Sequence, residues 1–342
     1  MKQIEKINEV RQFFLYKGLP VLAFKDKLHV GNVVLDATEN DDYFVEKNVL
    51  TKGVRGGNET NRYLYTDGHF GNDSIRPKYG PRNVYFSPDE YCCFEHDDAS
   101  NEGKVCFSDF GNEYCFSVET QDSFYLPSYN RGSSILVIPL WDDKTLLFYT
   151  KKGEKLWKYK EEDKGLEVSG SCIPIVDNVV VVISQEIVAT RKIQGFDIYT
   201  GDKLWELNGD CDYPNTFFMG EDKMLYGCMS KWNEGYVSSK IEMCKLNPFT
   251  GEVEIFVLRE GEKYEILPWL VTMHGRRLYY ADNRSGGEIG IIDVDKKELL
   301  DCTPLNLKGR CPIGAPIVTD GKVYLFIREM RELRVYENIP IG

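Results

Sequence analysis

The sequence lacks most of the patterns that identify a catalytic or metal-binding protein. It has four histidines in 342 residues, at His29, His69, His96 and His274, and they lie far apart along the chain. It contains no Cys-x-x-Cys pair, no His-Glu-x-x-His sequence, no Gly-x-Ser-x-Gly elbow and no Walker loop. We therefore predict no metal site, no cofactor and no catalytic residues. The 54 acidic residues still leave room for a carboxylate pair that hydrolyses glycosides.

Long apolar segments are absent as well. There is no run of 18 apolar residues, so we predict no membrane span. Residues 1–9 show neither an apolar signal region nor a small-residue cleavage site, which predicts a cytoplasmic location. In that compartment the ten cysteines are expected to be free thiols, and strand spacing predicts burial of Cys106, Cys115, Cys228 and Cys244.

Positive charge is scarce. The formal net charge is −12, so the surface as a whole repels phosphate backbones, and nucleic acid is a poor partner. The same charge attracts a basic protein over long distances, and it also keeps the chain soluble. We predict a protein partner, with a basic one as the favoured kind, and a chain that is monomeric alone.

What the sequence does contain is a repeated phrase, an apolar run, a tight turn and a second apolar run. It is clearest at residues 195–206 and returns at 244–254, 291–300 and 147–157. Taking Gly111, Gly153, Gly201, Gly251 and Lys297 as equivalent turn points, the steps are 42, 48, 50 and 46 residues. Each step holds about four short strands, so the repeat predicts sheets that must stack to bury their faces.

A second hairpin phrase precedes most of these, as at 174–182 and 316–325. Together they predict an all-β, single-domain β-propeller, most simply with seven four-stranded blades. The predicted blades cover 18–60, 80–120, 125–162, 166–210, 212–260, 264–306 and 311–342 with 1–17. The last unit is short, so we expect the N-terminal segment to supply its outer strand. The alternative is a helix, because Ile4, Ile7, Val10 and Phe14 are spaced for one helical face.

Two phrases together resemble the repeat of pyrroloquinoline-quinone-like (quinoprotein-type) β-propellers. One is apolar-Asp-apolar-x-Thr-Gly-x-x-Leu-Trp, seen at 196–205, and the other is Pro-Ile-Val-x-Asp-Gly-x-Val-Tyr, seen at 316–324. Residues 35–38 match it too. The resemblance implies a fold and no activity, because that family includes enzymes, assembly factors and binding modules. The calcium and quinone ligands of its dehydrogenases cannot be placed here. Trp157 and Trp205 follow the turn in this phrase and are expected to pack between strands.

Two stretches depart from the repeat, and there we place the candidate binding residues. Residues 51–82 are predicted as an insertion. The equivalent turns of the first two units, at Glu39 and Gly111, are 72 residues apart, whereas the other steps of the repeat are 42 to 50 residues. This stretch is locally basic and aromatic, as binding loops often are, and the alternative is an ordinary insertion over a blade edge. The second stretch is 210–235. The candidates are Arg55, Arg62, Tyr63, Tyr65, His69, Arg76, Tyr79, Tyr213, Phe217, Lys231 and Trp232.

These features favour a non-catalytic interaction protein, because propellers offer a rigid face rich in loops. The most concrete version is an intracellular bacterial immunity protein or inhibitor that caps a partner toxin or enzyme. Two alternatives remain open. One is an enzyme with a carboxylate site at the propeller mouth that acts on a glycan, and the other is a scaffold subunit of a larger assembly.

Overall fold

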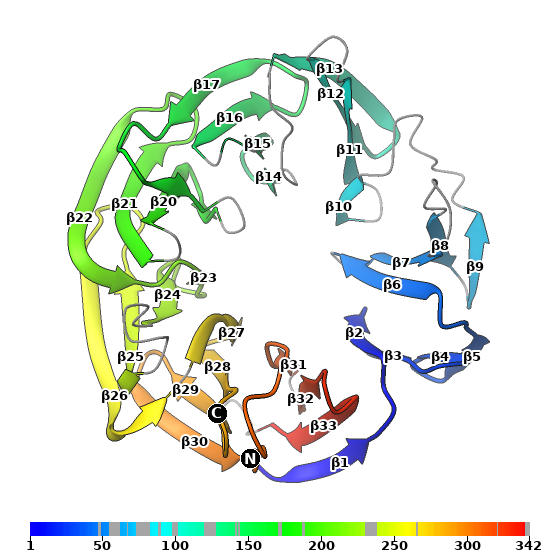
Figure 1. Ribbon diagram of the computed structural model, residues 1–342. Helices are drawn as coiled ribbons and strands as arrows, with labels where there is room; N and C mark the ends of the chain where they lie inside the picture. Colours follow the sequence, from blue (N-terminus) through cyan, green and yellow to red (C-terminus); the bar gives the residue numbers. More distant parts are fainter. Residues whose placement is uncertain are drawn as a thin grey trace. The chain divides into compact units, whose positions relative to one another are not determined.

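The structure is a computed structural model. It describes the chain except for residues 47–48, 55–61, 67, 73–82, 88–89, 98–101, 120–127, 141, 143, 170–172, 187–188, 230–237, 265, 320 and 339–342. The described residues form strands and no helix, and the strands are grouped into eight antiparallel sheets (Figure 1). The chain divides into two compact units. Unit 1 comprises Met1–Asn8, Asp143–Thr145 and Trp157–Gly342, and unit 2 comprises Glu9–Asp142 and Leu146–Leu156.

Unit 2 contains three complete sheets, each with its strands in chain order. The first has β2 (Gln12–Tyr16), β3 (Leu19–Ala23), β4 (Lys27–Val30) and β5 (Val33–Asp36). The second has β6 (Asp41–Glu46), β7 (Val49–Val54), β8 (Arg62–Thr66) and β9 (His69–Asn72). The third has β10 (Asn83–Ser87), β11 (Glu90–Asp97), β12 (Glu102–Asp109) and β13 (Asn112–Glu119). A fourth sheet includes residues of both units, and it has β14 (Ser128–Asn130), β15 (Ile135–Pro139), β16 (Thr145–Thr150) and β17 (Lys155–Lys160).

Unit 1 contains the other four sheets. The first has β18 (Glu167–Val168), β19 (Ile175–Val176), β20 (Val179–Glu186), β21 (Ala189–Asp197) and β22 (Lys203–Tyr213), with β18 and β19 both paired to β20. The next has β23 (Phe218–Met219), β24 (Leu225–Cys228), β25 (Ser238–Leu246) and β26 (Val253–Tyr264). The third has β27 (Ile266–His274), β28 (Arg277–Asp282), β29 (Glu288–Asp293) and β30 (Glu298–Pro304). The last has β31 (Ile317–Val318), β32 (Lys322–Ile327), β33 (Glu332–Glu337) and β1 (Gln3–Ile7).

The N-terminal segment forms a strand, as predicted, and the helical alternative is wrong. β1 pairs antiparallel with β33, with Gln3 opposite Tyr336 and Ile7 opposite Leu333 (Figure 1). The last sheet therefore takes three strands from the end of the chain and its outer strand from the beginning. Because β33 is covered by β1, it is not an exposed sheet edge.

The structure corrects the predicted number of sheets from seven to eight in the described part of the chain. Residues 51–82 were predicted as an insertion, but β8, β9 and most of β7 lie in this range and complete a sheet with β6. The turn points predicted from Gly111 onward are confirmed as hairpin turns. In the first two sheets the equivalent turns are at Gly31, between β4 and β5, and at Gly68, between β8 and β9. Both of these glycines have positive φ, at 56° and 87°, as Gly111 does at 84°. The 72 residues between Glu39 and Gly111 were interpreted as one unit with an insertion, so two short sheets were merged into one.

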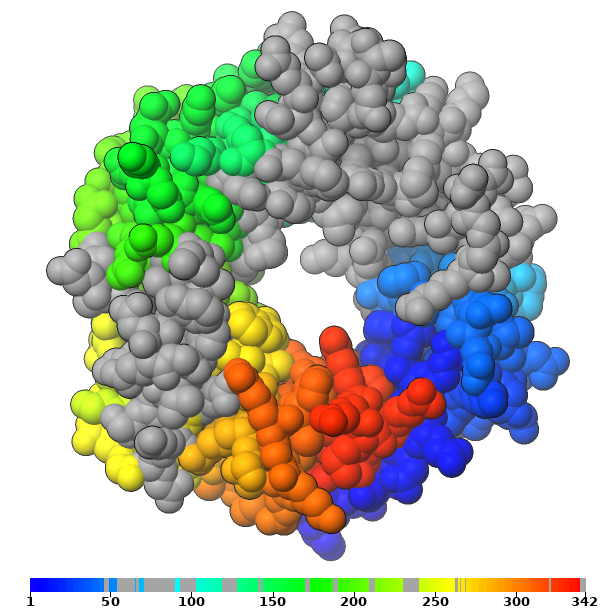
Figure 2. All heavy atoms as spheres, viewed as in Figure 1, coloured from blue at the N-terminus to red at the C-terminus, as the bar shows by residue number. Residues whose placement is uncertain are grey.

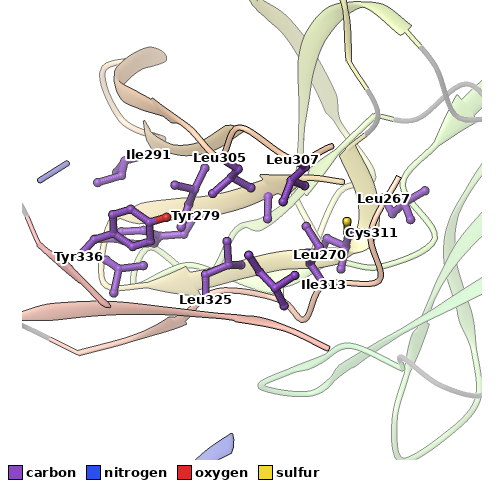
Figure 3. Close-up of a cluster of buried hydrophobic side chains, with 14 residues drawn as sticks. Leu267, Leu270, Tyr279, Ile291, Leu305, Leu307, Cys311, Ile313, Leu325 and Tyr336 are labelled. Carbon is purple, nitrogen blue, oxygen red and sulfur yellow. The ribbon is translucent and has the colours of Figure 1, made fainter. Parts of the chain in front are cut away.

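Neighbouring sheets of unit 1 bury their faces against one another. In β20, Val179–Ile183 is buried throughout, and a continuous run of β-branched residues is what a strand covered on both faces requires. Between the last two sheets, Tyr279, Ile291, Leu325 and Tyr336 form part of one apolar cluster (Figure 3). Figure 2 shows the orange and red residues of these sheets as one continuous surface.

One cysteine prediction is wrong. Cys106 and Cys115 are opposite each other in the β12–β13 register and form a disulfide, and Cys115 is exposed. They pair because the tight turn at Phe110-Gly111 places them in one cross-strand row. Cys228 and Cys244 are buried free thiols, as predicted.

Candidate functional site

The hairpin turns of three neighbouring sheets in unit 1 lie at one end of those sheets. We call this surface the turn face, and it consists of residues 177–178, 198–201, 220–223, 247–251, 275–276 and 294–297. Within the first sheet the Ile198 amide donates to the Asn178 carbonyl over 2.8 Å. Within the third, the Val294 amide donates to the Arg276 carbonyl over 3.2 Å. The inner and outer turns of a sheet are therefore side by side.

Contacts between sheets join these turns into one surface. Lys223 of the second sheet pairs with Asp177 of the first, at 2.7 Å between Nζ and Oδ2. Lys297 of the third sheet forms an ion pair with Glu254 of the second. The Trp205 indole of β22 donates to the Pro248 carbonyl in the next sheet over 2.7 Å. The turn face is thus a single rigid surface of unit 1.

The two tryptophans of the repeat phrase hold this surface in place. Trp157 donates its Nε1–H to the Ile198 carbonyl over 2.8 Å, just as Trp205 reaches Pro248. A Cβ added at Gly201 would lie 2.6 Å from the Trp157 ring, and one at Gly251 would lie 2.8 Å from the Trp205 ring. Each turn glycine therefore provides a positive φ and also the space for a tryptophan. This confirms that both tryptophans pack between sheets.

Two aromatic side chains project from the turn face. Tyr199 is 49% exposed and Phe249 is 36% exposed, and each lies two residues before the turn glycine of its sheet. Exposed aromatic rings are typical anchors of protein interfaces. Tyr199 and Phe249 are therefore the leading candidates for contact with a partner.

The fold does not require an aromatic residue at this position. The Asp197 carboxylate accepts hydrogen bonds from the amides of Tyr199 and Thr200, and Asn247 accepts one from Phe249 in the same way. These bonds involve only the backbone at the tip. At three other turns the equivalent position is charged, and is occupied by Asp109, Lys151 or Asp295. At the turns of Gly31 and Gly68 it is occupied by His29 and Thr66. The aromatic tips are therefore a property of this surface and not of the turn.

A cavity of about 230 Å³ opens on the turn face, between the second and third sheets. Its lining combines carboxylates, one guanidinium and two apolar side chains, from Gly220, Glu221, Asp222, Met273, Arg276, Val294 and Asp295. Arg276 is already paired with Asp295. Although burial alone would raise it, hydrogen bonds from Tyr226 and Lys245 hold the pKa of Asp222 below its usual range. The cavity therefore keeps an excess of negative charge at neutral pH.

The first sheet of unit 1 also contains a buried polar cluster, on the face toward β17. Lys192 contacts Glu161 Oε1 at 2.6 Å and Asp163 Oδ2 at 2.5 Å. The hydroxyl of Tyr159 is 2.8 Å from Glu161 Oε2, and Ser184 donates to the same oxygen over 2.5 Å. Glu161 and Asp163 both contact the Lys192 ammonium group, so they are a candidate for the carboxylate pair of a glycosidase.

The electrostatics of the cluster do not fit that role. Although burial alone would raise it, Lys192 and the hydroxyls of Ser184 and Tyr159 lower the pKa of Glu161 to about 2. Burial opposes the charge of Lys192, but its bonds to Asp163 and Glu161 leave its pKa raised. A carboxyl group held ionised in this way has no proton to give to a leaving group. The cluster joins strands, and it does not supply a general acid.

The cluster predicts a specific loss of stability in acid. The pKa of Glu161 is about 2 when folded, against an ordinary value of 4.5, so its contribution is complete above pH 4.5 and is lost as the pH falls toward 2. Between pH 5 and pH 3 the free energy of unfolding should fall by about 2 kcal/mol more in the wild type than in Glu161→Gln. Denaturant titrations at each pH measure this difference. Glu162→Gln, at an exposed neighbour, should keep the wild-type slope, and an equal slope in Glu161→Gln would contradict the assignment.

The residues predicted from the sequence are not gathered on the turn face. Tyr65 and Phe217 are buried in the cores of their sheets, which corrects their predicted surface role, and Tyr213 packs partly buried against the same cluster as Phe217. His69 is exposed at the start of β9, and Arg62 and Tyr63 are placed on β8. Five further candidates lie outside the described residues, namely Arg55, Arg76, Tyr79, Lys231 and Trp232. Partner binding by the candidates that are not buried stays a prediction.

The sequence carries a signal for Tyr199 and Phe249, because each is an aromatic residue two positions before a turn glycine, where three other repeats have a charged residue. Arg276 gave no signal, because the second sheet's part of the cavity, Gly220–Asp222, lies more than 50 residues away in the sequence.

Comparisons with solved structures identify the fold. The chain is similar to Sqt1 of Saccharomyces cerevisiae, at 11% identity and a TM-score of 0.60, over 99% of this chain and 100% of that one. It is similar to BamB from Moraxella catarrhalis, at 13% identity and a TM-score of 0.56, over 98% and 99%. Both are β-propellers. This protein has the β-propeller fold.

The propeller fold leaves the activity open. A catalytically inactive virginiamycin B lyase from Staphylococcus aureus, solved with quinupristin, is also similar, at 14% identity and a TM-score of 0.51, over 98% and 99%. No protein-family model matches the chain, and no curated protein matches it in sequence. The specific resemblance to the quinoprotein-type repeat therefore stays a prediction. A search of the described residues for a helix able to cross a membrane finds none.

Proposed function

We propose that this propeller is a non-catalytic protein-binding module that holds its partner on the turn face of unit 1. The observation that carries the proposal is the pair of exposed aromatic tips, Tyr199 and Phe249, at repeat-equivalent positions where three other turns have charged residues. Two aromatic anchors on neighbouring rigid turns suit a protein surface, because they bury a large area with little loss of side-chain entropy.

The charges indicate the kind of partner. In the cavity lining, Arg276 is paired with Asp295 and Asp222 is paired with Lys245. Glu221 adds a further carboxylate to this lining. A lysine or arginine side chain of a partner would complement this lining. The net charge of −12 would draw such a partner in by long-range attraction. The favoured partner is therefore a basic protein.

The most concrete form of the proposal is an intracellular bacterial inhibitor or immunity protein that caps a toxin or an enzyme. It rests on the acidic balance and on the sequence lacking known catalytic patterns. A cytoplasmic location and a monomeric free state belong to the same proposal. A scaffold subunit would use the same surface, and it differs in stoichiometry, because an inhibitor forms a closed one-to-one complex.

Affinity capture from native lysate tests the proposal at its first step. The tagged full chain should retain one basic protein in a one-to-one ratio, and that protein should leave the complex as salt rises, because rim charges are screened. Native mass spectrometry gives the stoichiometry. A chain recovered alone at every salt concentration, or glycan hydrolysis by the purified chain, would argue against the proposed function.

The aromatic tips give the sharper prediction. In Tyr199→Ala/Phe249→Ala the affinity for the captured partner should fall by about a hundredfold, since two anchors each contribute about 1–2 kcal/mol. Phe110→Ala is the matched control, because Phe110 is 64% exposed on a turn of unit 2. Titration calorimetry with the three proteins measures the difference. Equal affinities for the double variant and the control would remove the turn face from the proposal.

A further inference from the structure

The β12–β13 hairpin brings three metal-ligand side chains together, outside the surface described above. Cys106 and Cys115 are directly opposite, with their Cα atoms 4.1 Å apart. Glu113 is two residues before Cys115, so strand alternation places it on the same face of β13. One ligand atom from each of the three residues lies within 4.8 Å of the others.

This face of the hairpin is distinct from its apolar face. Val105 and Phe107, on either side of Cys106, belong to a buried apolar cluster, and Tyr114 and Phe116, on either side of Cys115, pack against that cluster. The cysteines point the opposite way. Cys106 is buried, whereas Cys115 and Glu113 are exposed. The hairpin therefore holds one sulfur firmly in the protein and leaves the other two groups open to ions and reductants.

The chemistry of the three groups matches a zinc ion. Zinc prefers thiolate and carboxylate ligands in a tetrahedral arrangement, and three protein ligands leave a fourth position for water. The usual short spacing of zinc cysteines is absent from this sequence because the two sulfurs are brought together by strand pairing. In the disulfide, neither sulfur is a thiolate, so the oxidised pair does not bind the ion.

We propose that the reduced hairpin binds one Zn²⁺ through Cys106, Cys115 and Glu113, and that oxidation of the two cysteines to their disulfide releases it. A cellular dithiol supplies the two electrons and two protons that open the disulfide to two thiols, and it is itself oxidised to a disulfide. Zinc then displaces both thiol protons and bonds to both sulfurs. In the reverse direction a cellular disulfide accepts the two electrons, takes up two protons from water and becomes a dithiol, while the bond between the two cysteine sulfurs forms and Zn²⁺ leaves.

Cobalt titration of the full chain tests this site. Co²⁺ is the probe, because its bond to a thiolate gives a near-ultraviolet charge-transfer band that zinc lacks. The protein is reduced with a phosphine under argon, and the phosphine is removed. The band should then grow to saturation at one equivalent of Co²⁺ and disappear when Zn²⁺ is added. The oxidised wild type, which has the same sequence, should give no band.

Variants assign the ligands. Cys106→Ser and Cys115→Ser should each abolish the band at one equivalent, and Glu113→Gln should weaken Co²⁺ binding by about tenfold or more. Cys302→Ser, at a free cysteine in unit 1, should leave the titration unchanged. A reduced wild type without the band would overturn the site, as would a band that survives Cys106→Ser/Cys115→Ser. Neither readout involves the partner, so the result is independent of the proposed function.

Discussion

Replacement of Lys192 by Met is expected to lower the free energy of unfolding by about 3–5 kcal/mol. Lys192 provides the positive charge in a buried cluster, and Glu161 beside it is fully buried. Without the ammonium group, the Glu161 carboxylate would have to stay charged in a region of low dielectric or take up a proton. Both are costly, because the group is shielded from water. Denaturant titration at neutral pH measures the loss.

Two further variants show that the loss comes from an unpaired buried charge. Lys203→Met removes an ammonium group that pairs with Glu206 at 2.7 Å on the surface, and it should cost less than about 1 kcal/mol. Lys192→Met/Glu161→Leu should regain at least half of the stability that Lys192→Met loses, since neither charge is then buried alone. If Lys192→Met costs no more than Lys203→Met, the cluster does not have the role assigned to it.

Trp205→Ala should be the next largest change, with a loss of about 3 kcal/mol. The ring is part of the apolar cluster between two sheets, and its Nε1–H satisfies the Pro248 carbonyl. Trp205→Phe keeps much of the contact but loses the hydrogen bond, so it should fall between the wild type and Trp205→Ala. Thermal unfolding of the three proteins gives the order.

The same packing predicts a dependence between two positions. A Cβ added at Gly195 would lie 2.2 Å from the Trp205 ring, so Gly195→Ala should be destabilising in the wild type. In Trp205→Ala the clash partner is gone, and Gly195→Ala should cost little. Gly309→Ala, where an added Cβ meets nothing within 4 Å, is the control in both backgrounds. Additive costs at Gly195 and Trp205 would contradict the packing described here.

The sequence predicted the repeat well wherever a turn glycine stood in its phrase. Gly111, Gly153, Gly201 and Gly251 all have positive φ, as a tight hairpin turn requires. The first two sheets were merged because the 72 residues between Glu39 and Gly111 were interpreted as one unit with an insertion, and neither Gly31 nor Gly68 was taken as a turn point. A glycine in a sequence does not by itself indicate a positive φ, and the turn can be predicted only where the residues around the glycine match a known hairpin pattern.

Burial was harder to predict than strand position. Tyr65 and Phe217 looked like surface anchors, because they lie in the two stretches that depart from the repeat, yet both are core residues. Conversely, Tyr199 stands inside the regular phrase and was not among the candidates, yet its ring is exposed. The direction of a side chain depends on the neighbouring sheet, and the sequence of one strand does not contain that information.

The buried cluster had no local signal at all. Glu161, Ser184 and Lys192 come from three separate segments, and each looks like an ordinary surface residue in its own stretch. Sheet pairing places Ser184 opposite Lys192, and the neighbouring sheet contributes Tyr159. Such clusters depend on contacts between distant residues, so only the folded structure reveals them.

Hydrogen exchange of the partner complex tests the central claim most directly. On binding, peptides that cover residues 197–202, 247–252 and 275–276 should exchange more slowly, and peptides from the sheet β2–β5 should be unchanged. This is the pattern for a partner held on the turn face of unit 1. Protection confined to unit 2, with these three turns unchanged, would contradict the account.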